Sequence, residues 1–355
     1  MLLRRTPDLR IDGRSLVESG ARVMILGAYG MGNVGDEAIL GGLLQRATAR
    51  ERLVVVSGAP AETEALHGVR AVGPSGALPA LRDVDALLIG GGGLFSRHMG
   101  RFGRMIPLFG LSALAMGKPV TIEGVSVDRS LPPMAKPFLI QLARRAVRVA
   151  VRDQHSARVL RAWGIDAAVE PDLSTYLEPP GKEESMGTLA SMGLDPTRPV
   201  VGLCLTAVEP NLDPVLEMMP AVIERLPGVQ FCFVPMSRHR SVSRHNDVLP
   251  ARRIQRRAPD LRILTGLHHP REVLGLFSHF SAAVCMRYHS MLFAQRMGVP
   301  VIGIPYAQKC ESWMREHRLR TVPLTEDALV EAIRNHVESA KPSCGCVLRP
   351  LVNRS

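Results

Sequence analysis

The sequence predicts an α/β protein in which two Rossmann-like domains with parallel sheets face a cleft. Three observations support this fold class. The chain of 355 residues is long enough for two domains. Short apolar runs alternate with amphipathic stretches along most of it, and a polar segment near the middle interrupts the alternation before it resumes. Such alternation is typical of a parallel sheet that is covered by helices on both faces.

The first part of the chain, residues 1–177, is predicted to form an N-terminal Rossmann-like domain. Its apolar runs predict buried strands, and the stretches with helical periodicity between them predict helices. The strands are expected at 22–27, 52–57, 85–90, 119–123 and 147–151, and the helices at 36–50, 103–116, 134–145 and 154–163.

A segment rich in Pro, Gly, Ser and charge at 178–199 is interpreted as an interdomain linker. The pattern then restarts, which predicts a C-terminal Rossmann-like domain at 200–340 and a tail at 341–355. Strands are expected at 200–206, 229–234, 261–264, 282–286 and 299–304, and helices at 212–225, 271–277, 290–297 and 325–339. Ligands of such sheets bind outside the carboxyl ends of the strands, so the cleft is expected there.

The charge balance bears on partners. The chain has 44 Lys and Arg against 33 Asp and Glu, a formal net charge of +11, which favours anionic partners. Frequent use of arginine without functional meaning is the alternative. No basic tract is interleaved with aromatic residues, so no nucleic acid is expected.

Nothing at the N-terminus has the order of a signal peptide, and the longest apolar run, 105–117, is too short to span a bilayer. These features predict a cytoplasmic protein. A peripheral contact with the inner face of the membrane and the formation of a homo-oligomer are left open.

The six cysteines form no disulfide framework. Cys204, Cys232 and Cys285 lie in apolar runs that are typical of strands and are expected to be buried thiols. Cys344 and Cys346 lie in the tail. Two thiolates do not make a four-ligand zinc site, so no metal is predicted.

A glycine-rich loop follows the first predicted strand. Gly30, Gly32 and Gly35 fit the pattern G-x-G-x-x-G, in which the backbone turns tightly and approaches a ligand. With Asn33, these glycines are predicted to line a binding site. NAD is disfavoured as the ligand, because no acidic residue that could hold a ribose follows the second predicted strand.

Asp36 and Glu37 stand at the start of the next helix. Carboxylates at that position complement the helix dipole, so helix capping is the simpler interpretation. The functional interpretation is that Asp36 faces the cleft, where it binds a substrate or acts as a general base.

A second glycine cluster, at 90–93, follows the strand at 85–90. Glycine loses more conformational entropy on folding than other residues. Gly91, Gly92 and Gly93 therefore predict a stretch of backbone beside the first loop that has no room for side chains. A tight turn beneath a neighbouring helix is the alternative. Arg97 and His98 come next and could reach a sugar or a phosphate.

A turn in the second half brings a cation and an imidazole to the start of a helix, where anions bind. Arg287, Tyr288 and His289 form this turn, and the helix dipole is expected to lower the pKa of the histidine. Lys309, with Tyr306, follows the next strand, and Arg152 follows the strand at 147–151. A purely structural histidine is the alternative.

Together, these motifs resemble the polysaccharide pyruvyltransferase family. The resemblance is carried by GAYGMGNVGDEAIL at 27–40, IGGGGLF at 89–95, VRDQHSARVL at 151–160, EPDLS at 170–174 and MRYHSMLFAQRMGVPVIGIPYAQK at 286–309. It implies a GT-B-like fold and phosphoenolpyruvate as the donor. It also places Arg287, His289 and Arg152 at the donor pocket.

The resemblance implies a transferase that moves the pyruvyl group of phosphoenolpyruvate onto sugar hydroxyls. The product would be a pyruvate ketal on a cell-surface polysaccharide or its lipid-linked precursor. Arg287, Arg152 and Lys309 can neutralise the donor's anionic groups, so no cofactor is needed. His289 is expected to handle the donor-side proton, and Asp36 the acceptor hydroxyl.

Two other functions fit the sequence. One is a GT-B glycosyltransferase that uses a nucleotide sugar, for which Glu311 is the nearest acidic candidate to hold a ribose. The other is a non-catalytic protein of the same fold that binds a sugar or a phosphate. An NAD oxidoreductase ranks below both.

Overall fold

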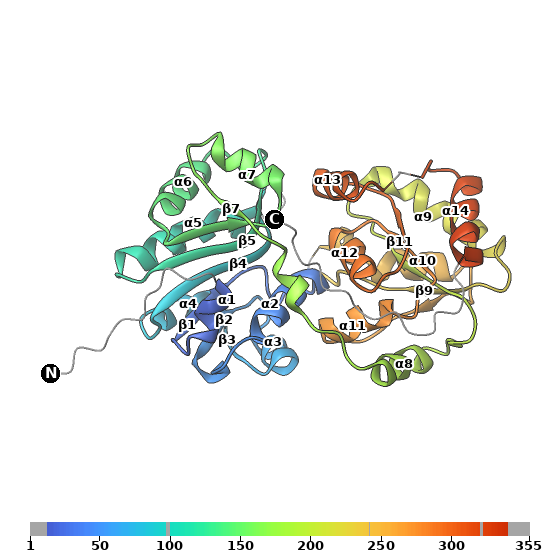
Figure 1. The fold of residues 1–355 in the computed structure, drawn as a ribbon, viewed down its shortest axis with the longest axis horizontal. Coiled ribbons are helices and arrows are strands. Elements are labelled where there is room, and N and C mark those ends of the chain that lie inside the picture. Colours follow the sequence, from blue (N-terminus) through green and yellow to red (C-terminus); the bar gives the residue numbers. More distant parts are fainter. Residues whose placement is uncertain (1–12, 97–99, 241, 320–321, 340–355) are drawn as a thin grey trace, which may run out of the picture.

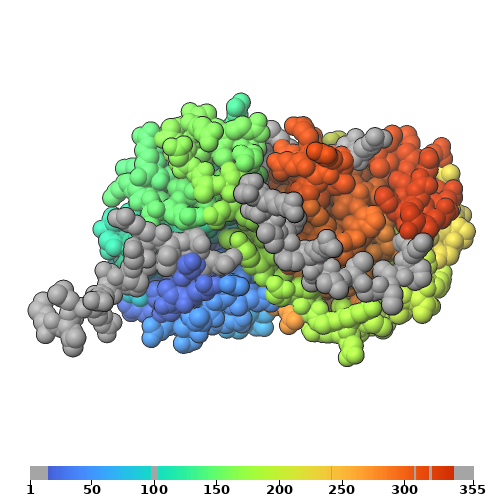
Figure 2. Space-filling model, in the orientation of Figure 1, coloured from blue at the N-terminus to red at the C-terminus, as the bar shows by residue number. Residues whose placement is uncertain are grey.

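The computed structural model describes residues 13–96, 100–240, 242–319 and 322–339. They form two α/β domains that lie side by side, the N-terminal one in blue and green and the C-terminal one in yellow to red (Figure 1). The space-filling view shows the same two colour ranges as separate lobes (Figure 2). Both sheets are parallel, so the predicted fold class is confirmed.

The N-terminal domain has a seven-stranded sheet in the order β3-β2-β1-β4-β5-β6-β7. Side chains along β1 alternate between two apolar clusters, with Met24 and Leu26 on one face and Val23 and Ile25 on the other. The strands are β1 (Val23–Leu26), β2 (Leu53–Val56), β3 (Arg70–Val72), β4 (Ala86–Phe95), β5 (Val120–Val127), β6 (Arg148–Val151) and β7 (Ala168–Val169). The helices are α1 (Gly13–Glu18), α2 (Val34–Leu44), α3 (Pro60–His67), α4 (Pro74–Leu81), α5 (Gly100–Ala115), α6 (Lys136–Arg145) and α7 (Gln154–Arg161).

The second glycine cluster corrects one expectation. Sequence reasoning ends this strand at residue 90 and lets the glycines follow it, whereas β4 continues through them to Phe95 and pairs with β5. Gly91 and Gly92 have φ angles of 76° and 78°, values that favour glycine. The register shifts between Gly92 and Phe95. The glycines therefore bend the strand from within.

The C-terminal domain has a five-stranded sheet in the order β10-β9-β8-β11-β12. Here too the side chains of the central strand alternate, with Val200 and Cys204 in one apolar cluster and Val201 and Leu203 in another. The strands are β8 (Val200–Cys204), β9 (Gln230–Phe233), β10 (Arg262–Ile263), β11 (Ala282–Cys285) and β12 (Val301–Gly303). The helices are α9 (Asp213–Glu224), α10 (Val248–Gln255), α11 (Pro270–Phe277), α12 (Tyr288–Arg296), α13 (Gln308–Glu316) and α14 (Glu326–Ser339).

The segment between the two sheets contains a helix that the sequence pattern does not predict, α8 (Lys182–Ser191). It lies beside α11 (Figure 1). Leu189 and Leu194 belong to an apolar cluster of the C-terminal domain. The connection between the sheets is therefore partly packed onto the second domain.

Helix α2 joins the two domains. Its residue Ala38 is fully buried in an apolar cluster of the C-terminal domain. The Val34 amide donates to the Met236 carbonyl at 2.9 Å, and the backbone of Asn33 pairs with that of Ser237 in an isolated antiparallel β-bridge. The start of α2 is thus fixed against the second domain, and the functional residues lie around it.

The described cysteines Cys204, Cys232 and Cys285 are buried free thiols, as expected. In the part of the chain that the structure describes, no helix is both long and apolar enough to cross a membrane.

Candidate functional site

The predicted turn after β11 is present. Arg287 is the N-cap residue of α12, so His289 lies in the first turn of that helix. Nε and Nη2 of the half-buried Arg287 each donate to an Asp247 carboxylate oxygen at 2.7 Å, and Nη2 also donates to the Thr206 hydroxyl at 2.9 Å. Burial works to lower the pKa of Arg287, but the Asp247 carboxylate outweighs it and raises the pKa. Two of the guanidinium nitrogens are therefore already engaged.

The His289 ring lies at the domain interface. Its Nε2 is 3.5 Å from Oδ2 of Asp172, and its side chain is 10% exposed. A Cβ atom built on Gly35 would lie 1.9 Å from Nδ1, so only glycine leaves room for the ring at that position in α2. Burial lowers the pKa of His289, which is the predicted direction, although burial rather than the helix dipole is the main cause.

Asp172 and Arg152 form a buried ion pair beneath this ring. Nη1 of Arg152 donates to Oδ2 of Asp172 at 2.7 Å, and both side chains are 1% exposed. Nε of Arg152 donates to the Ser126 hydroxyl at 2.7 Å, and the guanidinium stacks 4.4 Å from the centre of the Tyr288 ring. Burial opposes the charge of Asp172, but attraction to His289 and Arg152 keeps its pKa well below the ordinary value.

Asp36 lies against the bent part of β4. A Cβ built on Gly92 would lie 2.4 Å from Oδ1 of Asp36, so the bare glycine makes space for this carboxyl group. Burial raises the pKa of Asp36 to about 7, while Lys309 and Arg152 act in the opposite direction. A carboxyl group with that pKa can both accept and donate a proton near neutral pH.

Lys309, in α13, brings a further positive charge toward this group. Its side chain is exposed, yet its charge acts on Asp36 and on His289. Arg152 acts on the same two residues. The two cations therefore share one electrostatic environment with the two candidate proton-transfer groups.

The structure thus brings Asp36, Gly35, Gly92, Arg152, Tyr288, His289 and Lys309 together at the interface. The side chain of Arg287 has different partners. Within the described ranges, no hydrogen bond or ion pair joins it to His289 or Asp36, and the groups that act on its charge include Asp247, Tyr306 and Cys310. It still shares one neighbour with the group, because Arg287, Arg152 and Lys309 all act on the Cys310 thiol.

The remaining predicted residues of the two glycine-rich segments make contacts of their own outside this group. The Gly30 amide donates to Glu37 at 2.8 Å, and the Gly32 carbonyl accepts from the Arg238 amide at 2.8 Å. Asn33 caps α2, its side chain accepting from the Gly35 amide at 3.0 Å. A side chain at Gly91 would strike Ile39, whereas one at Gly93 would meet no atom within 4 Å. Arg97 and His98 lie outside the described residues.

Sequence reasoning assigned no role to Asp172 or Asp247. Asp172 follows the short strand β7, inside one of the quoted motifs, so its place at the carboxyl edge of the sheet was a usable signal. Asp247 precedes α10 in a stretch with no strand pattern near it. Only the fold reveals that this carboxylate meets Arg287.

A family model described as polysaccharide pyruvyl transferase matches residues 33–308. No curated protein matches the chain.

Several solved structures are similar in fold. The UDP-GlcNAc 2-epimerase of Neisseria meningitidis bound to UDP-GlcNAc is 12% identical, with 89% of this chain and 91% of that chain covered and a TM-score of 0.61. The UDP-GlcNAc 2-epimerase of Methanocaldococcus jannaschii is 10% identical, with 89% of this chain and 92% of that chain covered and a TM-score of 0.60. Anabaena HepE in complex with UDP and glucose is 11% identical, with 90% of each chain covered and a TM-score of 0.57. At such low identities these likenesses show the fold alone, which is the GT-B-like arrangement.

Proposed function

The chain belongs to the polysaccharide pyruvyl transferase family, and we propose that it transfers the pyruvyl group of phosphoenolpyruvate to a sugar. The acceptor would carry two hydroxyls that end in a pyruvate ketal. It would belong to a polysaccharide or to its lipid-linked precursor at the cytoplasmic face of the membrane. The enzyme is a transferase, and the donor and the product are the proposed part.

One observation carries the proposal: Arg152 and Lys309 act together on Asp36 and His289 at the domain interface. Phosphoenolpyruvate carries a phosphate and a carboxylate, so its site requires cations next to groups that can move protons. Arg152 is already held by Asp172 and Ser126. Lys309 is exposed and makes no ion pair among the described residues, so it is the cation most open to a substrate.

The reaction needs two hydroxyl additions and one leaving group. A proton adds to the methylene carbon of the donor, which becomes a methyl group, and positive charge develops on the adjacent carbon. One sugar hydroxyl attacks that carbon and the bond to phosphate breaks. The second hydroxyl then closes the ketal, so that one hydroxyl proton ends on the methyl group and the other on the released phosphate.

His289 and Asp36 are the proposed proton-transfer groups. Burial lowers the pKa of His289 and raises that of Asp36 to about 7. The shift of Asp36 brings its pKa to neutral pH, where proton transfer in either direction is efficient. The shift of His289 goes the other way and favours the neutral imidazole, which releases a proton readily once it has been protonated. We assign the donor-side proton to His289 and the acceptor hydroxyl to Asp36. Asp172 would then be a positioning residue, because it faces Nε2 and leaves Nδ1 toward Gly35.

A phosphate-release assay with phosphoenolpyruvate and a panel of sugar acceptors tests the proposal. We expect release only with acceptors that offer two suitably placed hydroxyls, and a product whose mass has increased by one pyruvate ketal. Thermal protection by UDP or GDP but not by phosphoenolpyruvate, without ketal formation on any acceptor, would contradict the proposal in favour of a nucleotide-sugar enzyme.

A further inference from the structure

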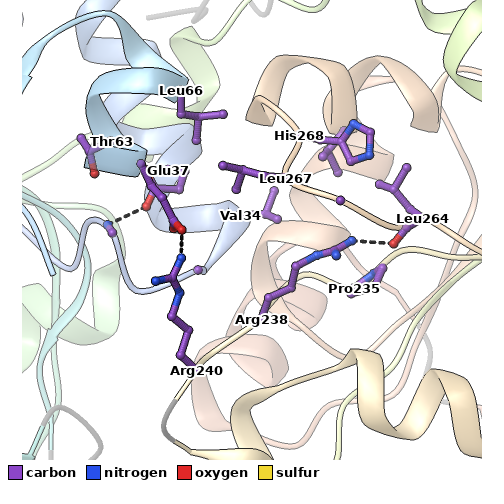
Figure 3. Close-up of a pocket in the computed structure, with 15 residues that line it drawn as sticks. Val34, Glu37, Thr63, Leu66, Pro235, Arg238, Arg240, Leu264, Leu267 and His268 are labelled. Atoms are coloured by element: carbon purple, nitrogen blue, oxygen red, sulfur yellow. Dashed lines mark hydrogen bonds and ion pairs between the residues drawn. The ribbon is translucent and has the colours of Figure 1, made fainter. Parts of the chain in front are cut away.

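A cavity of about 230 Å³ lies between the two domains, on the other side of the start of α2. Figure 3 shows side chains from both domains facing into it. The N-terminal domain contributes Gly30, Gly32, Val34, Glu37, Glu62, Thr63 and Leu66, and the C-terminal domain contributes Pro235, Arg238, Arg240, Leu264, Gly266, Leu267, His268 and Val273.

This cavity is separate from the group around His289. The first turn of α2 divides the two, because Val34 and Glu37 line the cavity while Gly35 and Asp36 face the other way, toward His289 and Gly92. Residues three apart lie on one face of a helix, which explains the division. The backbone bonds from the start of α2 to the C-terminal domain complete the wall.

Arg238 gives the cavity its charge. Nη2 donates to the Leu264 carbonyl, as Figure 3 shows. Within the described ranges, Arg238 forms no ion pair with a carboxylate, in contrast to Arg152 and Arg287. Burial lowers its pKa, and the attraction of Asp247, whose carboxylate is already bonded to Arg287, does not offset this effect. An anion placed in the cavity would supply the missing partner.

The rest of the wall mixes apolar side chains with polar groups that already have partners in the protein. Both Glu37 oxygens are occupied, one by the Gly30 amide and the other by His67, and the Thr63 hydroxyl pairs with Ser57. Leu267, at 56% exposure, is one of the chain's exposed large apolar residues. Such a wall offers little to read the hydroxyls of a sugar, but it suits an apolar body.

We propose that this cavity is a second ligand site, which takes a phosphate ester with an apolar body. The phosphate would contact Arg238, and the apolar body would lie against Leu66, Leu264 and Val273. Phosphoenolpyruvate does not fit this description, since it carries two anionic groups and no apolar body. The other arginine of the cavity, Arg240, is already paired with Glu62. A prenyl phosphate and a nucleoside phosphate share the required chemistry.

Calorimetric titration of the full chain separates these sources. The probes are geranyl phosphate, UMP, inorganic phosphate and phosphoenolpyruvate. We expect geranyl phosphate or UMP to bind at least tenfold more tightly than inorganic phosphate, and whichever binds identifies the source. We also expect neither probe to compete with phosphoenolpyruvate. Binding of both esters no tighter than inorganic phosphate, or competition with phosphoenolpyruvate for one site, would overturn the proposal.

Variants make the test specific. Arg238→Gln should weaken binding of the ester roughly 10- to 100-fold, as expected for a lost hydrogen bond to a charged group. Arg252→Gln removes the same charge from the exposed face of α10 and should change nothing. Leu267→Trp should block the cavity from an exposed position, so it provides a second test if Arg238→Gln fails to fold. Full binding in folded Arg238→Gln or Leu267→Trp protein would refute the site, and normal phosphoenolpyruvate binding in both variants would separate this result from the proposed function.

Discussion

The two sides of the first turn of α2 differ in how their charges are balanced. On one side, Arg152 meets Asp172 at 2.7 Å, and His289 lies beside the same carboxylate. On the other side, Arg238 is half-buried, and among the described residues its side chain bonds a carbonyl oxygen and forms no ion pair. The first side is therefore nearly filled by its own ionised groups, whereas the second has an open cavity and an unbalanced cation.

This difference indicates two ways in which a protein prepares for a ligand. Preorganised charges need no rearrangement when charge develops on a reacting group. The desolvation free energy of these buried ions is offset during folding, because each ion has a partner of opposite charge. An unbalanced cation beside an empty cavity instead receives its partner when the ligand binds. Substitutions on the first side should thus affect turnover and stability, and those on the second should affect binding.

His289→Ala should give the largest effect, a loss of turnover of about 10²- to 10⁴-fold, the range that general acid–base groups contribute. Steady-state kinetics with phosphoenolpyruvate measures it, and thermal unfolding shows whether the variant is folded. His336→Ala, on the distant helix α14, is the matched control. Near-normal turnover in a folded His289→Ala protein would end the proposed role and remove the contrast between the two sides.

Asp36→Asn should stabilise the protein at alkaline pH. The pKa of Asp36 is about 7 in the folded chain, against an ordinary value of 3.8. The folded state therefore holds an extra proton between these values, and the free energy of unfolding falls as the pH rises through that window. Asparagine cannot ionise, so at pH 8 the variant should be more stable by up to about 4 kcal/mol, at about 1.36 kcal/mol per pH unit.

Denaturant unfolding at pH 4 and pH 8 checks this prediction. The difference from the natural protein should fall below about 1 kcal/mol at pH 4, because this pH lies close to the ordinary pKa of 3.8 and the folded state holds little extra proton there. Asp260→Asn, on the exposed surface, serves as the control. An equal stability difference at the two pH values would show that Asp36 ionises normally and that burial does not control it.

Most strands of the two sheets were predictable because periodicity is a local property, although the short strands β3 and β7 were not predicted. The apolar runs that predicted β1, β2, β8 and β11 are buried on both faces, as parallel strands require. The glycines of β4 were harder to interpret, since glycine is common in turns, and here a bulge within a paired strand accommodates them. Helix α8 was missed because its sequence, KEESMGTLAS, has little amphipathic pattern.

The residues of the candidate site were likewise predictable only where a local sequence pattern places them. Residues that follow strands, such as Arg152 and His289, could be placed at the carboxyl edges of the sheets from the sequence alone. Their partners could not, because the pairing of Arg287 with Asp247 joins residues 40 positions apart. The proximity of Asp36 to Gly92 likewise depends on how α2 packs on β4. Side-chain partners across a fold leave no periodic signal in the sequence.

Arg287→Ala should weaken phosphoenolpyruvate binding by about 1.5–3 kcal/mol, typical of a hydrogen bond to a charged group. The structure adds a complication, since the substitution also leaves Asp247 buried without its cation. The double variant Arg287→Ala/Asp247→Ala removes both charges and separates the two effects. If calorimetry shows unchanged donor binding in the double variant while the single variant is only less stable, Arg287 is a structural residue and does not belong to the donor pocket.

Glu62→Gln should have the smallest effect, a change in the free energy of unfolding below about 1 kcal/mol. Glu62 pairs with Arg240 across the rim of the cavity, and both side chains are largely exposed, at 41% and 67%. Water and salt screen such pairs, which typically contribute about 0–1 kcal/mol. Denaturant unfolding at low and high salt measures the change. A loss well above 1 kcal/mol that persists at high salt would mean that the pair holds the domains together. The cavity would then owe its shape to that rim contact rather than to the backbone bonds at the start of α2.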